Sequence, residues 1–315
     1  MSSSKQSNKQ RTGFIWQLLE NRKASAGAVL ILFFVLLGLF GPLLVRVDPS
    51  AFVGPPHQEP SSEYLFGTTG QGQDVLAQTV AGARTSLTVG FLTGFAVMAI
   101  GALVGMTAGF FGGWVDSVLS FITNVFLIIP GLPMAVVIAA YLQPGPVTIG
   151  LVLVITGWAW NARMLRSQIL SLREKDFVLA AIVSGEGRMR IIFREILPNM
   201  TSLLMSGFIS ATVYAIGAQV GLEFLGIGDV STVTWGTNLY WASNDAALLT
   251  GAWWTIIPTG VCVALIGFAL VLVNFAIDEI TNPRLRAERT WTRLLKSHDL
   301  EGGLSTPVVR HSGNN

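Results

Sequence analysis

The chain has few side chains that could perform catalysis within its apolar segments. Its three histidines are His57, His298 and His311, its one cysteine is Cys262, and no His-Glu-x-x-His sequence occurs. Hydrolysis inside a membrane ordinarily needs a histidine-bound metal or an acid–base pair, so these residues argue against an intramembrane enzyme. The sequence also lacks a Gly-x-x-x-x-Gly-Lys-Ser/Thr loop, the usual cradle for ATP phosphates. We expect no catalytic residue, metal or cofactor in this chain.

The densest cluster of charges lies in residues 171–198, SLREKDFVLAAIVSGEGRMRIIFREILP. Ser171 and Glu174 form a capping-box pattern, which predicts the start of a helix. One aromatic and two minimal side chains then recur at a spacing of four: Phe177, Ala181 and Gly185. This spacing places them on one helix face, and Gly185 is suited to end the helix. A short helix with such a face is suited to docking another protein; the alternative is a solvated amphipathic linker.

Long uncharged stretches must position this segment: 85–115, 117–162, 196–222 and 246–277. Only 12% of residues are charged and the mean hydropathy is +0.58, against about 25% charged residues in soluble domains. About 20 apolar residues span a bilayer as a helix. The sequence predicts an all-α polytopic membrane protein with six transmembrane helices, at about 26–46, 86–110, 115–141, 147–162, 199–222 and 252–278.

Two further patterns concern the region around the second predicted helix. Five glycines follow a spacing that is mostly four: Gly90, Gly94, Gly101, Gly105 and Gly109. Such spacing favours close helix packing in lipid. Residues 72–83, just before this helix, have the pattern of a separate amphipathic surface helix.

Lysines and arginines predict the orientation. Residues 1–25, 163–198 and 279–315 contain five, seven and six of them, so that all but Arg46 and Arg84 lie in these segments. Cytoplasmic segments of membrane proteins are enriched in these residues. We expect a cytoplasmic N-terminal tail (1–25), a first span, an external loop (47–84), a core (85–282) that contains the cytoplasmic loop 171–198, and a cytoplasmic C-terminal tail (283–315). Residues 223–251, with Glu223, Asp229 and Asp245, form a second external loop.

Part of the charged loop resembles a family motif. The sequence LAAIVSG…EILP resembles the cytoplasmic loop of binding-protein-dependent ABC importer permeases, Glu-Ala-Ala-x-x-x-Gly followed after nine residues by Ile-x-Leu-Pro. Five residues match it: Ala180, Ala181, Gly185, Leu197 and Pro198. Leu179 stands at the Glu position and Glu195 at the Ile position, with Ile196 one place later. The missing glutamate removes one polar contact that the motif implies with a partner.

Three other segments resemble the dipeptide/oligopeptide/nickel class of these permeases, in the same order along the chain. They are FGTTGQGQDVLAQTVAGARTSLTVG at 66–90, GLEFLGIG at 221–228 with Trp235–Gly236, and DEITNPRLR at 278–286. Thr69, Gln73 and Gln78 depart from the usual Asp and two frequent arginines of that class. The resemblance covers roughly 26–286.

The resemblance implies the C-type permease subunit of an ATP-driven importer in a prokaryotic plasma (inner) membrane. Its implied partners are a homologous second permease, two ABC ATPases that bind ATP and Mg, an external or periplasmic solute-binding protein and membrane lipid, with no nucleic acid. The cargo would be a peptide, a nickel complex or an oligosaccharide. The residues implied to couple to the ATPase are Phe177, Ala180, Ala181, Gly185, Ile196, Leu197 and Pro198.

Four polar residues within the predicted spans are candidates for a translocation path: Asn124, Asn161, Gln219 and Asn274. Hydrogen bonds between helices are the alternative role for each. An ion-coupled carrier or a channel is the main rival function. Such proteins commonly place ionisable groups at mid-membrane, and the centres of the predicted spans contain none.

Overall fold

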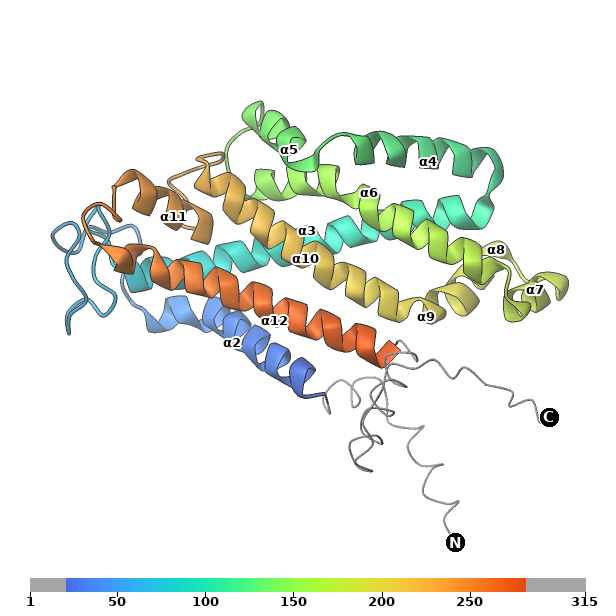
Figure 1. The fold of residues 1–315 in the computed structure, drawn as a ribbon, viewed down its shortest axis with the longest axis horizontal. Coiled ribbons are helices and arrows are strands. Elements are labelled where there is room, and N and C mark those ends of the chain that lie inside the picture. The colour runs from blue at the N-terminus through green and yellow to red at the C-terminus, as the bar shows by residue number, and fades with distance from the viewer. Residues whose placement is uncertain (1–20, 282–315) are drawn as a thin grey trace, which may run out of the picture.

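Helices make up most of the computed structural model, which describes residues 21–281 (Figure 1). Within this range a single isolated bridge, between Thr68 and Asp74, joins extended segments. Most of the predicted tail 1–25, all of 283–315 and part of the motif at 278–286 lie outside the described residues.

Five helices are long and apolar enough to cross a membrane: α2 (Arg22–Leu44), α3 (Val75–Phe111), α6 (Pro146–Arg173), α10 (Thr201–Phe224) and α12 (Ile257–Thr281). A sixth crossing requires two shorter helices together, α4 (Gly113–Ile128) and α5 (Gly131–Ala140), which meet at an angle of 86°. The all-α polytopic fold is confirmed, with six crossings when the bent pair counts as one.

The bend between α4 and α5 has a local cause. Ile129 precedes Pro130, and proline disfavours helical geometry in the residue before it. Ile129 accordingly adopts an extended conformation, with φ −76° and ψ 126°. The helix resumes at Gly131, and the amide of Met134 bonds to the carbonyl of Pro130 at 3.1 Å. The single helix predicted for 115–141 is therefore two helices at a sharp angle.

Two helices extend beyond their predicted ends. α3 begins at Val75, so the separate surface helix predicted at 72–83 is wrong; its residues form the first turns of α3, capped by Asp74. α6 continues past the predicted end at residue 162 to Arg173. In both cases the helical hydrogen bonds continue beyond the apolar stretch. Hydropathy marks the apolar stretch only, so it does not locate these helix ends.

Close packing around α3 forms the centre of the bundle. A Cβ added to Gly94 would lie 2.7 Å from the Cα of Thr212 on α10, and one added to Gly105 would lie 2.5 Å from the carbonyl oxygen of Ala162 on α6. These glycines bring the backbones together, as their spacing predicts. Buried side chains of α2, α10 and α12 join α3 in one apolar cluster, which includes Phe34 and also Trp235 at the start of the short helix that follows residue 234.

The short elements gather at the two ends of the bundle. At one end lie α7 (Asp176–Val183), α8 (Arg188–Ile191), the π-helical segment η2 (Ile192–Ile196) and α9 (Leu197–Asn199). The beginning of α2 and the end of α12 lie at this end as well (Figure 1). The loop 45–74, α11 (Trp235–Asn244) and the single turn η3 (Trp253–Thr255) lie at the other end.

Candidate functional site

The helix α7 lies where α6 ends (Figure 1). The turn between them is short: Glu174 caps α6, and the carbonyl of Lys175 accepts bonds from the amides of Val178 and Leu179 at 2.9 and 3.0 Å. The helix start predicted at Ser171 is wrong, because Ser171 lies inside α6 and α7 begins at Asp176. The predicted helix itself is present.

The inner side of α7 is held to the bundle by apolar contacts. Val178 is completely buried, and Ala181 packs against the same cluster. The other members come from α3, from α6 and from the segment after α7, and include Phe110, Leu165, Ile169, Ile191, Ile192, Ile196 and Met200. Because this cluster joins α7 to α6 and to the start of α10, we expect the three to move together.

The outer side of α7 exposes large apolar side chains. Leu179, Ile182 and Val183 are 47%, 46% and 87% exposed, and Phe177 is 39% exposed. Ala181, which shares the predicted docking face with Phe177, instead lies partly buried. An apolar surface of this kind marks an interaction site more often than a solvated linker.

Gly185 ends α7, as predicted. Its φ is +76°, a left-handed conformation that glycine adopts at little cost. Its amide bonds to the carbonyl of Ile182 at 3.0 Å, and the amide of Glu186 bonds to the carbonyl of Ala181 at 3.1 Å. These two bonds satisfy carbonyls at the helix end and fix the direction in which the chain returns to the bundle.

The residues predicted to close the loop have different surroundings. Ile196 is buried in the apolar cluster, Leu197 is half-buried, and Pro198 is exposed. Pro198 has no backbone N–H to donate to the preceding turn. The amide of Leu197 reaches back to the carbonyl of Ile192, which gives the wider π-helical turn η2. Ile196 thus supports the loop from inside, whereas Pro198 lies on its surface.

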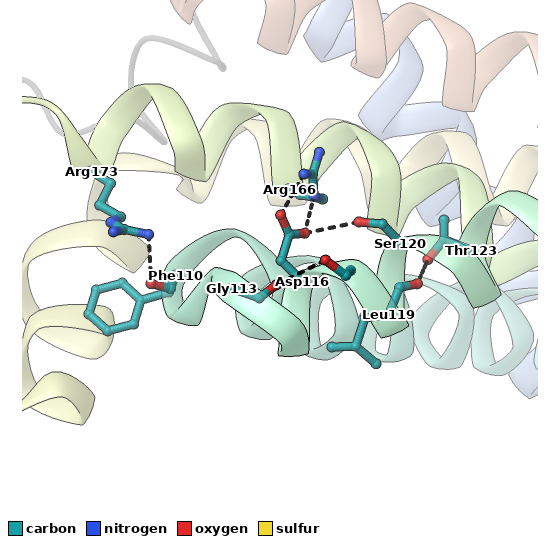
Figure 2. Close-up of polar contacts among 9 residues, drawn as sticks. Phe110, Gly113, Asp116, Leu119, Ser120, Thr123, Arg166 and Arg173 are labelled. Atoms are coloured by element: carbon teal, nitrogen blue, oxygen red, sulfur yellow. Dashed lines mark hydrogen bonds and ion pairs between the residues drawn. The ribbon is translucent and has the colours of Figure 1, made fainter.

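Two arginines fasten the end of α6 to the α3–α4 connection (Figure 2). Arg173 donates to the carbonyl of Phe110, the penultimate residue of α3, at 3.1 Å. Arg166 forms a two-point ion pair with Asp116 in the first turn of α4; its Nη2 lies 2.7 Å from Oδ2. Ser120 donates to Asp116 as well, at 2.9 Å. These contacts link the segment that carries α7 to the bent helix pair.

The four candidate path residues do not lie in one place. Asn124 lines a cavity of about 230 Å³ beside Arg163 and Arg166. Asn161 lines a second cavity, of about 390 Å³, between α4–α5, α6 and α10.

The other two residues bond to neighbouring side chains. Asn274 accepts a hydrogen bond from Ser206 at 2.7 Å and donates one to Ser210 at 3.1 Å, which connects α12 to α10. Gln219 is completely buried and donates to Glu223 at 3.0 Å. The bonds of Asn274 join two helices, as in the alternative role, whereas the bond of Gln219 lies within α10.

Two family models match this chain. One describes the binding-protein-dependent transport system inner membrane component and matches residues 101–287. The other describes the N-terminal transmembrane domain of oligopeptide transport permease C and matches residues 10–63. The first match covers more than half of the chain. The chain belongs to the binding-protein-dependent transport permeases.

Individual relatives in this permease family are similar along most of their length. A dipeptide transport system permease protein of Alkalihalophilus pseudofirmus is 31% identical over 86% of this chain and 89% of its own. An oligopeptide transport system permease protein of Bacillus subtilis is 30% identical over 84% and 87%. One from Mycobacterium bovis is 31% identical over 90% and 97%.

The end of the permease opposite α7 contains a buried acid. Glu223, predicted to lie in an external loop, is only 2% exposed in the last turn of α10. Thr234 donates to its Oε2 at 2.6 Å. The next residue, Trp235, is fully buried and donates from its amide to Ser86 and from its ring to the carbonyl of Thr79, both at 3.0 Å. These bonds fasten the start of α11 to α3 and α10.

Sequence reasoning missed several residues of these sites. The exposed side chains Leu179, Ile182 and Val183 alternate with inward ones, so the pattern of α7 alone does not identify its outer face. The pair Asp116–Arg166 had a signal, because Asp116 is the one charged residue in 85–162 and an isolated acid in an apolar stretch calls for a partner. Tyr214, which lines the larger cavity, gave no such signal.

Proposed function

We propose that this permease forms one half of the transmembrane path of an ATP-driven peptide importer and is driven through α7. The observation that supports coupling is the apolar outer face of α7, held to the bundle on its inner side by Val178 and fastened through α6 to α4. The family membership and the names of the relatives support an importer of peptides.

The proposed coupling is mechanical. The exposed side chains of α7 dock into a groove on an ATPase subunit, as an amphipathic helix binds a groove through spaced apolar anchors. Phe177, Ala180, Ala181 and Gly185 belong to the coupling helix, and Ile196, Leu197 and Pro198 return the chain to α10. Movement of the ATPase then displaces α7 together with the end of α6. Arg166 and Arg173 pass that displacement to α4 and α3.

The remaining parts of the importer come from partners. A second, homologous permease completes the path, two ABC subunits bind and hydrolyse ATP with Mg, and an external solute-binding protein delivers the peptide. The α7 end of the bundle and both termini face the cytoplasm, whereas the loop 45–74 and α11 face outward. Asn124 and Asn161 line the path on this chain's side, while Gln219 and Asn274 brace it.

Reconstitution tests this function. The purified chain in lipid vesicles is expected to show neither ATP hydrolysis nor peptide uptake, and the complex with both permeases, both ATPases and the binding protein is expected to import trialanine. Hydrolysis by the chain alone, or a complete complex with ATPase activity and no peptide uptake, would contradict the proposal.

Cysteine labelling tests the orientation. In a Cys262→Ser background, an impermeant maleimide added to intact cells is expected to label Ser61→Cys and Ser243→Cys and to spare Ser171→Cys. All three serines are exposed, so their accessibility depends on the side of the membrane. The opposite labelling pattern would reverse the topology.

A further inference from the structure

The larger cavity contains an amide with no hydrogen-bond partner. Asn161 is only 6% exposed and lines the cavity between α6, α10 and the bend of α4–α5. Its side chain forms no hydrogen bond with any residue in the described range 21–281. Its Oδ1 lies 3.4 Å from the Cβ position of Gly207. The side chain lines the cavity and has no bond to the protein there, so its amide is available to bond a ligand.

Other polar and aromatic groups line the same cavity. The hydroxyl of Tyr214 lies 3.5 Å from the Cβ position of Gly131, beside the first residue of α5. Thr156 and Ser210 add hydroxyls, and Phe126 and Trp160 add aromatic rings. The volume of about 390 Å³ falls within the range of small-molecule sites. None of the described residues that line the cavity is charged.

The absence of charge in this lining restricts the chemistry of a ligand. A charged group would be desolvated here without a counter-charge from the lining, which is unfavourable. An asparagine amide donates through its NH₂ and accepts through its carbonyl oxygen. The complementary group is another amide, which offers one acceptor and at least one donor. A peptide bond meets this requirement, and the rings of Phe126 and Tyr214 suit a small apolar side chain beside it.

We infer that this cavity is a binding site for an uncharged segment of a peptide backbone, with Asn161 as the amide-recognising residue and Tyr214 as a second polar contact. The inference rests on the proposed function, because it assigns a residue-level site to the peptide path. It also predicts that the cavity does not discriminate between cationic and anionic peptides, since it presents no charge to either.

Charge preference tests the site in the complete reconstituted complex. Uptake of three peptides is measured: trialanine, Ala-Lys-Ala and Ala-Glu-Ala. Each is tested with the wild type and with the variants Asn161→Leu, Asn161→Asp and Tyr214→Phe. Asn161→Leu is nearly isosteric and is expected to lower trialanine uptake about tenfold, the change that corresponds to one lost hydrogen bond. Tyr214→Phe is expected to give a smaller loss. Asn161→Asp is expected to favour Ala-Lys-Ala over Ala-Glu-Ala, a charge preference that the wild type lacks and that a purely structural defect does not produce.

Two variants outside the cavity serve as controls. Tyr141→Phe removes a hydroxyl from a residue that is 87% exposed, and Thr107→Val removes one that bonds only to its own helix, at Leu103. Both are expected to import like the wild type. Wild-type uptake by Asn161→Leu, or equal loss of both charged peptides by Asn161→Asp, would overturn the inference while the proposed function stands. If Asn161→Leu fails to assemble, Tyr214→Phe with wild-type uptake overturns the proposed contact. A wild-type complex that imports no peptide overturns both.

Discussion

Asp116 and Arg166 are 50 residues apart in the sequence, and their two-point ion pair joins the first turn of α4 to the C-terminal part of α6. The side chains are 20% and 33% exposed, so the pair is partly shielded from solvent. Seven residues further along α6, Arg173 makes the neighbouring contact to α3 (Figure 2). The pair thus lies between α7 and the bent helix pair, whose residues line both cavities.

Breaking this pair is expected to weaken coupling more than stability. Asp116→Asn removes the charge, and we expect it to cost about 1 kcal/mol or less in unfolding free energy, because partly exposed pairs contribute little. Peptide uptake per ATP hydrolysed is expected to fall severalfold, because a displacement of α6 is no longer transmitted to α4. The exchange Asp116→Arg with Arg166→Asp is expected to recover part of the loss. Unchanged uptake per ATP in Asp116→Asn would exclude the pair from the coupling route.

The outer face of α7 is expected to be essential for transport and dispensable for folding. Val183→Glu places a charge on a side chain that is 87% exposed, so the chain should insert and fold normally. Against an apolar groove of the ATPase, the same charge would be buried unpaired, which costs several kcal/mol. We expect the ATPase subunits to dissociate during purification and uptake to be lost. Ser184→Glu, on the neighbouring exposed residue, is the matched control; equal behaviour of the two variants would argue against docking through this face.

Gly236 packs so closely against Glu223 that a larger residue at position 236 has no room for its side chain. A Cβ at residue 236 would lie 2.5 Å from Oε2 of Glu223 and 2.9 Å from the carbonyl of Val220. Gly236→Ala is therefore expected to destabilise the protein by about 1–3 kcal/mol, the usual cost of overpacking, and to loosen α11. Thermal unfolding in detergent measures the effect. Gly221→Ala, where a Cβ meets nothing within 4 Å, is expected to be neutral.

Asp245 is expected to make stability depend on pH. Burial raises the pKa of its carboxyl above the ordinary value, although the charge on His57 opposes the shift. The folded state therefore binds the proton more tightly, and the stabilisation present below about pH 4 is lost as the pH rises through the folded pKa. Asp245 also caps the C-terminus of α11, where a negative charge is unfavourable by about 0.5 kcal/mol.

Asp245→Asn is accordingly expected to raise the melting temperature at pH 7 and to have no effect near pH 4. Asp229→Asn is the control with the opposite sign, because bonds from Ser231 and Thr232 lower the pKa of the Asp229 carboxyl. Its folded state favours the charged form, so this substitution should lower the melting temperature at pH 7. These pKa shifts would be contradicted if Asp229→Asn raised the melting temperature at pH 7. They would also be contradicted if Asp245→Asn left it unchanged at that pH.

The crossings could be predicted from the sequence because a bilayer imposes a length of apolar chain on each one. The same is true of the glycine spacing of α3, whose close contacts with α10 and α6 follow from small side chains at one helix face. The end of α7 at Gly185 was equally predictable, since few residues other than glycine adopt a φ of +76° without strain.

Local patterns were less reliable where two conformations compete. Ser171 and Glu174 have the residue types of a capping box, but α6 runs through Ser171 to Arg173 because continued helical bonding outweighs a new start. Pro130 was visible in the sequence, and yet the 86° bend was not predicted, because prolines occur in membrane helices both with and without a sharp turn.

The sequence by itself determined the number of crossings, the segregation of basic residues and the position of a short amphipathic helix, because each depends on composition or spacing along the chain. Only the tertiary structure decided that Ala181 lies inward and Val183 outward, that Asp116 meets Arg166, and that Asn161 lines a cavity while Asn274 is bonded. Those outcomes depend on how each helix is rotated against its neighbours. That rotation is set by side-chain packing among segments far apart in the chain, where nearly every helix face is apolar and no single pattern marks the inner one.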